Sequence, residues 1–295
     1  MRPPARRIWL IVRANGFTLI ELLVVISIVA MLIAVLLPVL GRARAQARTV
    51  VCQTHLRQWG ILFAAYTADN NGRFFPDWYE SSDGLYRGRP TWVRPMMEHV
   101  QGERGIHLCP LARKLTDPTG MSHRAVRSGH GATFSAWTAP NYRDPPTPPR
   151  GSYGLNEWVC RPVALDRSDR SDRTASDRAG KYWGTAYVRG AASVPLFSDA
   201  ALYTTLPEHT HAPPEHADIW FVKFYVDTTM DEVCIDRHSG SVNLLMLDSS
   251  VRKVGLKELW TLKWNRKFDT QGPWTKAGGV QPSDWPEWMR GFRDY

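Results

Sequence analysis

Apolar residues are concentrated near the start of the chain, in a run from Phe17 to Leu40 that follows a short basic segment. As a helix that rises about 1.5 Å per residue, this run would be roughly 36 Å long. That length is enough to cross the hydrocarbon core of a bilayer, which is about 30 Å thick. The pattern therefore predicts a transmembrane helix over residues 17–40.

This apolar run contains one charged residue, Glu21. An acid at the centre of a membrane costs about 3 kcal/mol, and less near the end of the segment, where Glu21 lies. The many Leu, Ile, Val and Phe side chains outweigh that cost, so we expect the helix to insert. A charge retained at such a place indicates a functional role.

The residues around the start of the run match a known signal. The sequence Gly16-Phe17-Thr18-Leu19-Ile20-Glu21 follows a leader that has no acid and contains four arginines, Arg2, Arg6, Arg7 and Arg13. This order resembles the type IV prepilin signal, which is also found in pseudopilins of type II secretion. The resemblance implies that prepilin peptidase cuts after Gly16, that Phe17 is then N-methylated, and that Glu21 helps subunits to register in a filament.

Two other interpretations of this segment are possible. An ordinary secretory signal would have an apolar stretch of about 7–15 residues with small residues before the cleavage site. Residues 17–40 form a longer run without such an end. A plain single-pass anchor is the second alternative, and arginines on both sides of the run do not decide its orientation.

The helical pattern continues beyond the apolar run, over residues 41–72. Apolar or aromatic side chains recur at spacings of three and four residues, which predicts one face that packs on a globular domain; they are Val51, His55, Trp59, Leu62 and Tyr66. Pro38 should kink the helix. The turn-forming sequence Asp69-Asn70-Asn71-Gly72 should end it.

Residues 73–295 are expected to form an extracytoplasmic head. Apolar, β-prone segments predict strands at 193–199, 219–226, 241–247 and 250–254, with a two-residue hairpin turn at Asp248-Ser249 and an amphipathic helix at 256–268. Pro-rich and charge-repeat segments predict mobile insertions near 140–150 and 166–178.

With the leader at 1–16, the expected fold class is α+β and pilin-like: a long kinked N-terminal helix packed on a head with an antiparallel β-sheet.

The net charge of the chain gives little support to a nucleic-acid function. The 295 residues carry a formal charge of +9, and removal of the four leader arginines would reduce it to +5. A modest positive excess aids solubility rather than marking a binding function. We therefore expect no nucleic-acid partner.

The four cysteines, Cys52, Cys109, Cys160 and Cys234, leave two possibilities open. Outside the cytoplasm, one or two disulfides are plausible, and four cysteines allow three pairings. Isolated buried thiols are the alternative. No CxxC motif is present, which argues against a zinc site.

Further motifs resemble a pilin-like family of planctomycete and verrucomicrobial type. His238 is followed by nine residues and then Asp248, where that family has His, nine residues and Asp-Gly; Ser249 replaces the Gly. Other matching segments are 52–76, Cys109-Pro110, 151–156 and 256–264. His238 and Asp248 would fix a hairpin through hydrogen bonds, or would join Asp199 in a metal or acid–base site.

Other candidate metal ligands lie in one histidine-rich loop. His209, His211 and His216 flank two prolines, and a solvated loop is the alternative interpretation. Asp69, Asn70 and Asn71 offer oxygens to Ca²⁺, although their spacing is not that of an EF-hand. We assign no cofactor on these patterns, with Ca²⁺ or Zn²⁺ as the ions to test, and no catalytic residue.

These observations predict a structural, non-enzymatic subunit of a type IV pilus-like or type II secretion pseudopilus-like filament. The implied partners are prepilin peptidase, other subunits, an inner-membrane assembly platform with its ATPase, and lipid before assembly. The helix would span the inner membrane once, with the head periplasmic or extracellular. The alternative is a membrane-tethered module that binds a carbohydrate or a metal and does not polymerise.

Overall fold

The computed structural model describes most of the chain, in ranges separated by gaps. The described residues are 18–76, 79–80, 87–88, 92–93, 95–96, 105–115, 129–139, 149–162, 178, 180–217 and 230–295. The chain divides into two compact units, Met1–Gln46 and Ala47–Tyr295. The leader, the expected strand at 219–226 and most of the two expected insertions lie outside the described residues.

The dominant helix is α1, Leu19–Asp69, which includes Pro38 in its interior. Proline lacks an N–H donor and crowds the preceding turn, so a kink there stays a prediction. The helix ends where turn chemistry was expected: Asn71 and Gly72 have φ of 53° and 74°. Gly72 donates its N–H to the carbonyl of Thr67 at 2.7 Å, which confirms the predicted C-terminal cap.

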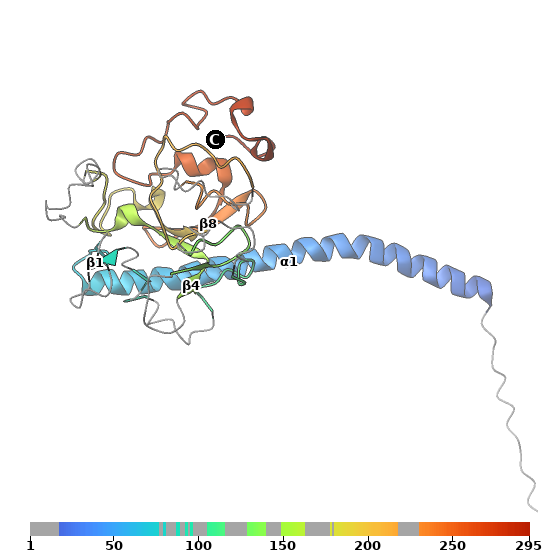
Figure 1. Ribbon diagram of the computed structural model, residues 1–295. Helices are drawn as coiled ribbons and strands as arrows, with labels where there is room; N and C mark the ends of the chain where they lie inside the picture. Colours follow the sequence, from blue (N-terminus) through green and yellow to red (C-terminus); the bar gives the residue numbers. More distant parts are fainter. Residues whose placement is uncertain are drawn as a thin grey trace, which may run out of the picture. The chain divides into compact units, whose positions relative to one another are not determined.

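The second unit is built on a five-stranded sheet, with strand order β7-β5-β6-β8-β9. Its strand β8 is labelled in Figure 1. Its strands are β5 (Tyr153–Asn156), β6 (Pro195–Asp199), β7 (Thr204–Thr205), β8 (Ser241–Met246) and β9 (Val251–Gly255). All neighbours pair antiparallel except β5 and β7. The α+β class with a mostly antiparallel sheet is therefore confirmed.

Short elements complete the described part of the chain. Two strand pairs are β1 (Tyr79–Glu80) with β2 (Arg87–Gly88), and β3 (Trp137–Thr138) with β4 (Arg150–Gly151). The 3₁₀ turns are η1 (Glu157–Val159), η2 (Ala191–Ser193), η3 (Leu256–Thr261), η4 (Pro282–Asp284) and η5 (Glu287–Met289). The helix expected over 256–268 is therefore only the short η3, because the backbone turns extended at Leu262.

The core of this unit forms where the second half of α1 meets the sheet. Trp59 and Phe63 are fully buried, and their ring centroids lie 5.1 and 5.2 Å from that of Phe197 on β6. The indole of Trp59 donates to the carbonyl of Ile106 at 3.0 Å, so this large apolar ring carries no unpaired donor. These contacts fix α1 against the sheet within this unit.

The buried face of α1 is rotated from the predicted one. Trp59 and His55 are buried as expected, but Val51 is 44% exposed, and the neighbouring Cys52 is fully buried. The buried stripe of α1 is Cys52, His55, Leu56, Trp59, Gly60, Phe63 and Thr67. Two adjacent stripes satisfy the same three-and-four spacing, and packing against the sheet selects this one.

The β8–β9 hairpin was predicted correctly, but its turn was not. Met246 donates its N–H to the carbonyl of Ser250 at 2.8 Å, and Ser249 donates to that of Met246 at 2.9 Å, which makes a three-residue loop of Leu247–Ser249. Ser249 lies in the left-handed region with φ of 68°. The predicted two-residue turn at Asp248-Ser249 would need positive φ at two non-glycine residues, and the longer loop needs it at one.

Candidate functional site

The N-terminal signal is described only in part, because Gly16 and Phe17 lie outside the described residues. Glu21 lies in the first turn of α1, where its Oε2 accepts from the backbone N–H of Thr18 at 2.9 Å and from its hydroxyl at 2.7 Å. The backbone N–H of Glu21 in turn donates a hydrogen bond to the Thr18 hydroxyl at 3.2 Å. This reciprocal capping box orients the Glu21 carboxylate at the start of the helix.

The apolar part of α1, from Leu19 to Leu40, is exposed in the structure. Side chains from Leu19 to Leu40 that would be buried in a soluble protein are exposed, many by more than half. Within the described residues, α1 is the one helix long and apolar enough to cross a membrane. An exposed apolar surface of this extent requires lipid or a protein partner to cover it.

A compact group of four side chains lies inside the head. Cys52, Cys109, Asp199 and His238 each offer one donor atom, and these atoms all lie within 4.8 Å of one another. The side chains of Asp199 and His238 have no exposed surface. Both thiols are completely buried as well. We call this group the Cys–Asp–His cluster.

Four separate segments of the chain supply the cluster. Cys52 projects from the buried face of α1, and Asp199 is the last residue of β6. Cys109 follows a turn in which Leu108 donates to the carbonyl of Gly105. His238 precedes β8 and is held there by Ser241, whose hydroxyl donates to the His238 carbonyl at 2.6 Å.

Several donor atoms of the cluster lie in direct contact with one another. His238 Nε2 lies 3.2 Å from Asp199 Oδ2 and 3.6 Å from Cys109 Sγ. Cys52 Sγ lies 3.5 and 3.6 Å from the two oxygens of Asp199. All four donor atoms therefore converge within 4.8 Å of one another.

A second layer of polar groups orients the cluster. The hydroxyl of Thr49 lies 3.1 Å from His238 Nδ1, the ring nitrogen that does not contact Asp199. Arg237 Nη1 lies 3.2 Å from Asp199 Oδ1, and the backbone N–H of Asn243 donates to Oδ2 at 2.8 Å. Tyr153 donates its hydroxyl to Cys52 Sγ at 3.3 Å.

Interactions among these buried groups shift their pKa values in different directions. Burial acts to raise the pKa of Asp199, but the charge and hydrogen bond of His238, with Arg237, lower it to about 2. Burial acts to lower the pKa of His238, but Asp199 raises it to about 9. The pKa of Cys109 falls to about 6 against the effect of burial, through hydrogen bonds with Cys52 and His238. Burial raises the pKa of Cys52 well above its usual range.

Asp248, the other half of the His-x₉-Asp pattern, does not join the cluster. It is exposed in the β8–β9 loop, where its Oδ1 accepts from the backbone N–H and hydroxyl of Ser250 at 2.9 and 2.6 Å. The suggestion that Asp199, His238 and Asp248 meet is therefore half correct. The hairpin role of Asp248 agrees with the local hydrogen-bonding interpretation.

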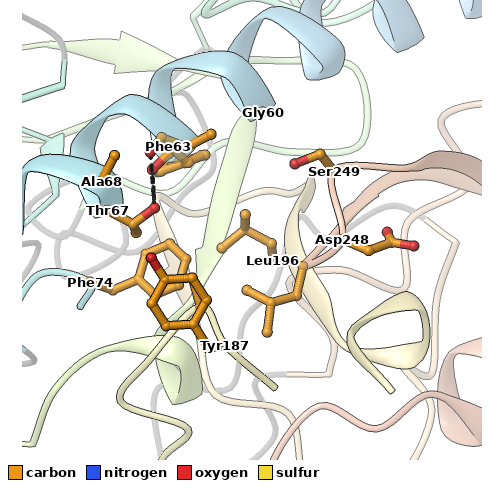
Figure 2. Close-up of a pocket in the computed structure, with 12 residues that line it drawn as sticks. Gly60, Phe63, Thr67, Ala68, Phe74, Tyr187, Leu196, Asp248 and Ser249 are labelled. Atoms are coloured by element: carbon orange, nitrogen blue, oxygen red, sulfur yellow. Dashed lines mark hydrogen bonds between the residues drawn. The ribbon is translucent and has the colours of Figure 1, made fainter. Parts of the chain in front are cut away.

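Asp248 instead borders an open pocket of about 290 Å³ between α1 and the hairpin loop. Figure 2 shows Phe63 and Thr67 of α1 on one side, with Leu196 and Tyr187 across from them. Among the residues that line this pocket, Asp248 alone has an acidic or basic side chain. The pocket therefore has no pair of groups for acid–base chemistry.

The histidine-rich loop does not gather its three candidate ligands. His211 Nδ1 accepts a hydrogen bond from the backbone N–H of Glu208 at 3.2 Å. The ring of His209 packs on Phe268, with ring centroids 5.7 Å apart. His216 is exposed. In the described part of the chain, these histidines belong to no group of three metal-ligating side chains.

The cysteines are all free thiols in the structure, and all four are buried. Cys160 and Cys234 lie outside the cluster. The sequence patterns placed Asp199 and His238 in one possible site and Cys109 in a separate motif. They did not connect these residues with Cys52, because no short spacing joins them.

Comparisons with known proteins agree on the N-terminal segment. Residues 12–37 match the family described as the prokaryotic N-terminal methylation motif. The chain is 48% identical over 58 residues to the type IV wide pilus major component PilA4 of Thermus thermophilus.

The match to PilA4 covers 20% of this chain and 44% of the pilin, so the chain spans less than half the length of this relative. No solved structure matches the chain. With the long helix and the mostly antiparallel head, these findings show an N-terminal region similar to that of type IV pilins, with a methylation motif, on a pilin-like α+β fold.

Proposed function

We propose that the chain is a structural subunit of a type IV pilus-like or type II secretion pseudopilus-like filament. The observation that carries the proposal is the exposed apolar part of α1, whose residues 19–37 lie within the matched methylation motif. Lipid covers this helix before assembly, and the helices of neighbouring subunits cover it afterwards. The head would lie on the periplasmic or extracellular side of the inner membrane.

Processing creates the charge that Glu21 would meet. A cut after Gly16 by prepilin peptidase leaves a free or methylated amine on Phe17, which is positive. Two opposite charges removed from water together are tolerated when they pair. Glu21 of one subunit would pair with the Phe17 amine of its neighbour and set the register, as one buried polar residue does in a coiled coil.

The capping box supports this role for Glu21. In the isolated chain, the carboxylate is already held at the helix start by Thr18. A preorganised acceptor loses less conformational freedom when it binds its partner. An inner-membrane platform with its ATPase and other subunits are the partners that such assembly requires. The role needs no catalytic residues in the head.

The test uses Glu21→Val with a matched control in the same apolar run. Ser27 is also polar, and its hydroxyl donates to the Leu23 carbonyl within the helix. We expect Glu21→Val to insert and to be cleaved but to give few filaments, and Ser27→Val to assemble like the unmodified chain. Electron microscopy of cells and mass spectrometry of the N-terminus provide the readouts.

Two results would contradict the proposal. Abundant filaments from Glu21→Val would remove the register role of the acid. An intact leader on protein recovered from its native cell would favour a simple membrane tether that does not polymerise.

A further inference from the structure

We propose that the Cys–Asp–His cluster binds one Zn²⁺ as a closed structural site, with ligands Cys52, Cys109, Asp199 and His238. The proposal goes beyond filament formation and does not depend on it. Four protein donors without an open position are the coordination of structural zinc sites, whereas catalytic sites keep a place for water or substrate.

The spacing of the donor atoms fits a tetrahedral ion. Zinc bonds of about 2.3 Å to sulfur and 2.0–2.1 Å to nitrogen or oxygen place tetrahedral ligands about 3.3–3.8 Å apart. The separations from His238 Nε2 are 3.2 Å to Asp199 and 3.6 Å to Cys109. Cys52 Sγ lies 3.6 Å from the same Asp199 oxygen, Oδ2, that faces His238. The side chains therefore need little movement to take up an ion.

The second layer fits the same interpretation. A metal-bound histidine usually donates its other ring N–H to an oxygen acceptor, and Thr49 supplies that oxygen at 3.1 Å from Nδ1 of His238. This contact leaves Nε2 facing the cluster. Arg237 and the backbone of Asn243 hold the Asp199 carboxylate in place.

Charge balance favours an ion with two positive charges. Two thiolates and one carboxylate carry three negative charges, which a divalent ion and the buried Arg237 guanidinium neutralise together. Full burial makes this balance important, because an uncompensated charge is expensive inside a protein. Two sulfur donors with one imidazole select zinc over Ca²⁺ or Mg²⁺, which prefer oxygen.

Two other states of the cluster are alternatives that the experiment separates. One is a metal-free network, with Asp199 paired to Arg237 and His238. The other is a disulfide between Cys52 and Cys109, which an oxidising compartment would favour. Bound zinc would protect both sulfurs from that oxidation.

The first measurement is the metal content of the full chain, purified in detergent without reducing agent or chelator. Inductively coupled plasma mass spectrometry should find about one zinc per chain. Cys109→Ser should lose at least nine-tenths of this zinc. Cys234→Ser is the matched control, since its thiol is equally buried but lies outside the cluster, and it should keep the full amount.

The second measurement needs no variant and remains decisive if Cys109→Ser fails to fold. Zinc in the unmodified chain is exchanged for Co²⁺, whose absorption should show thiolate-to-cobalt charge transfer and the intense visible bands of tetrahedral coordination. Peptide mapping under non-reducing conditions should find Cys52 and Cys109 unlinked.

Each contrary result overturns the proposal. Metal-free protein as isolated indicates the hydrogen-bonded network alone, and a Cys52–Cys109 crosslink indicates the disulfide. Equal zinc in the two cysteine variants, or cobalt spectra without a thiolate band, places the ion elsewhere, for example at the loop histidines. None of these results bears on whether the chain forms filaments.

Discussion

Arg237 is a fully buried cation, and its replacement by methionine should destabilise the head strongly. Its guanidinium pairs with Asp199 and donates to the carbonyls of Ala132, Thr133, Ser152 and Ala200. Methionine is shorter than arginine and replaces only the aliphatic stem of the side chain. The change removes the charge and its hydrogen bonds together with the volume of the guanidinium.

The expected cost follows from the Asp199 carboxylate and the four carbonyls, which lose the buried guanidinium, while His238 stays paired with Asp199. Removal of one partner from a buried ion pair costs about 3–5 kcal/mol, and the carbonyls left without a donor keep the cost in this range although His238 still compensates part of the charge. Protein stability totals only about 5–15 kcal/mol. For a unit of this size, 1 kcal/mol corresponds to about 2–4 °C, so the melting temperature should fall by roughly 6–20 °C.

Differential scanning calorimetry of the chelator-treated chain in detergent measures this shift, since a bound ion could otherwise compensate Asp199. Arg266→Met is the control, because Arg266 is exposed and should change stability by less than about 0.5 kcal/mol. If Arg237→Met melts within about 2 °C of that control, less than the smallest shift expected here, the buried pair does not stabilise the head and the reasoning is refuted.

Two further predictions concern the hairpin loop and a buried acid. Ser249→Gly should raise the unfolding free energy by about 0.5–1 kcal/mol, because glycine adopts the left-handed conformation of this position without steric cost; unchanged or lower stability in calorimetry would contradict the loop geometry. Burial raises the pKa of Glu232 although His130, whose Nε2 lies 3.8 Å from Oε1, acts to lower it, so the stabilising contribution of Glu232 is present at low pH and is lost as pH rises through the folded-state pKa. Melting temperatures measured across the acidic range should therefore fall less steeply with rising pH for Glu232→Gln than for the unmodified chain, and parallel curves would refute this assignment.

Much of the fold could be predicted because local patterns determine it. The length and apolarity of the run at 17–40 require a helix, and Asn71-Gly72 supplies the positive φ that ends it. The β8–β9 hairpin follows from two β-prone segments around polar turn residues. The capping box at Thr18 and Glu21 is also readable from its spacing, although the charge of the acid is the more conspicuous signal.

The cluster could not be predicted in the same way. Its ligands come from a helix, a loop, a strand end and a turn, and the contact between Cys52 and Asp199 joins residues 147 positions apart. The absence of a CxxC motif therefore excluded only zinc sites made from short spacings. The His-x₉-Asp pattern drew attention to Asp248, which is near in sequence but points to its own loop.

The order of strands in the sheet has a consequence for how the head folds on the proposed periplasmic or extracellular side. The pairs β5–β6 and β6–β8 join segments that are far apart in sequence, and contacts of this kind form slowly. Until β8 arrives on the far side, β6 has an open edge that is able to associate with other chains. We therefore expect nascent molecules of this protein to depend on holdase chaperones during export, and a molecule shortened before residue 241 to aggregate rather than to remain as a stable monomer.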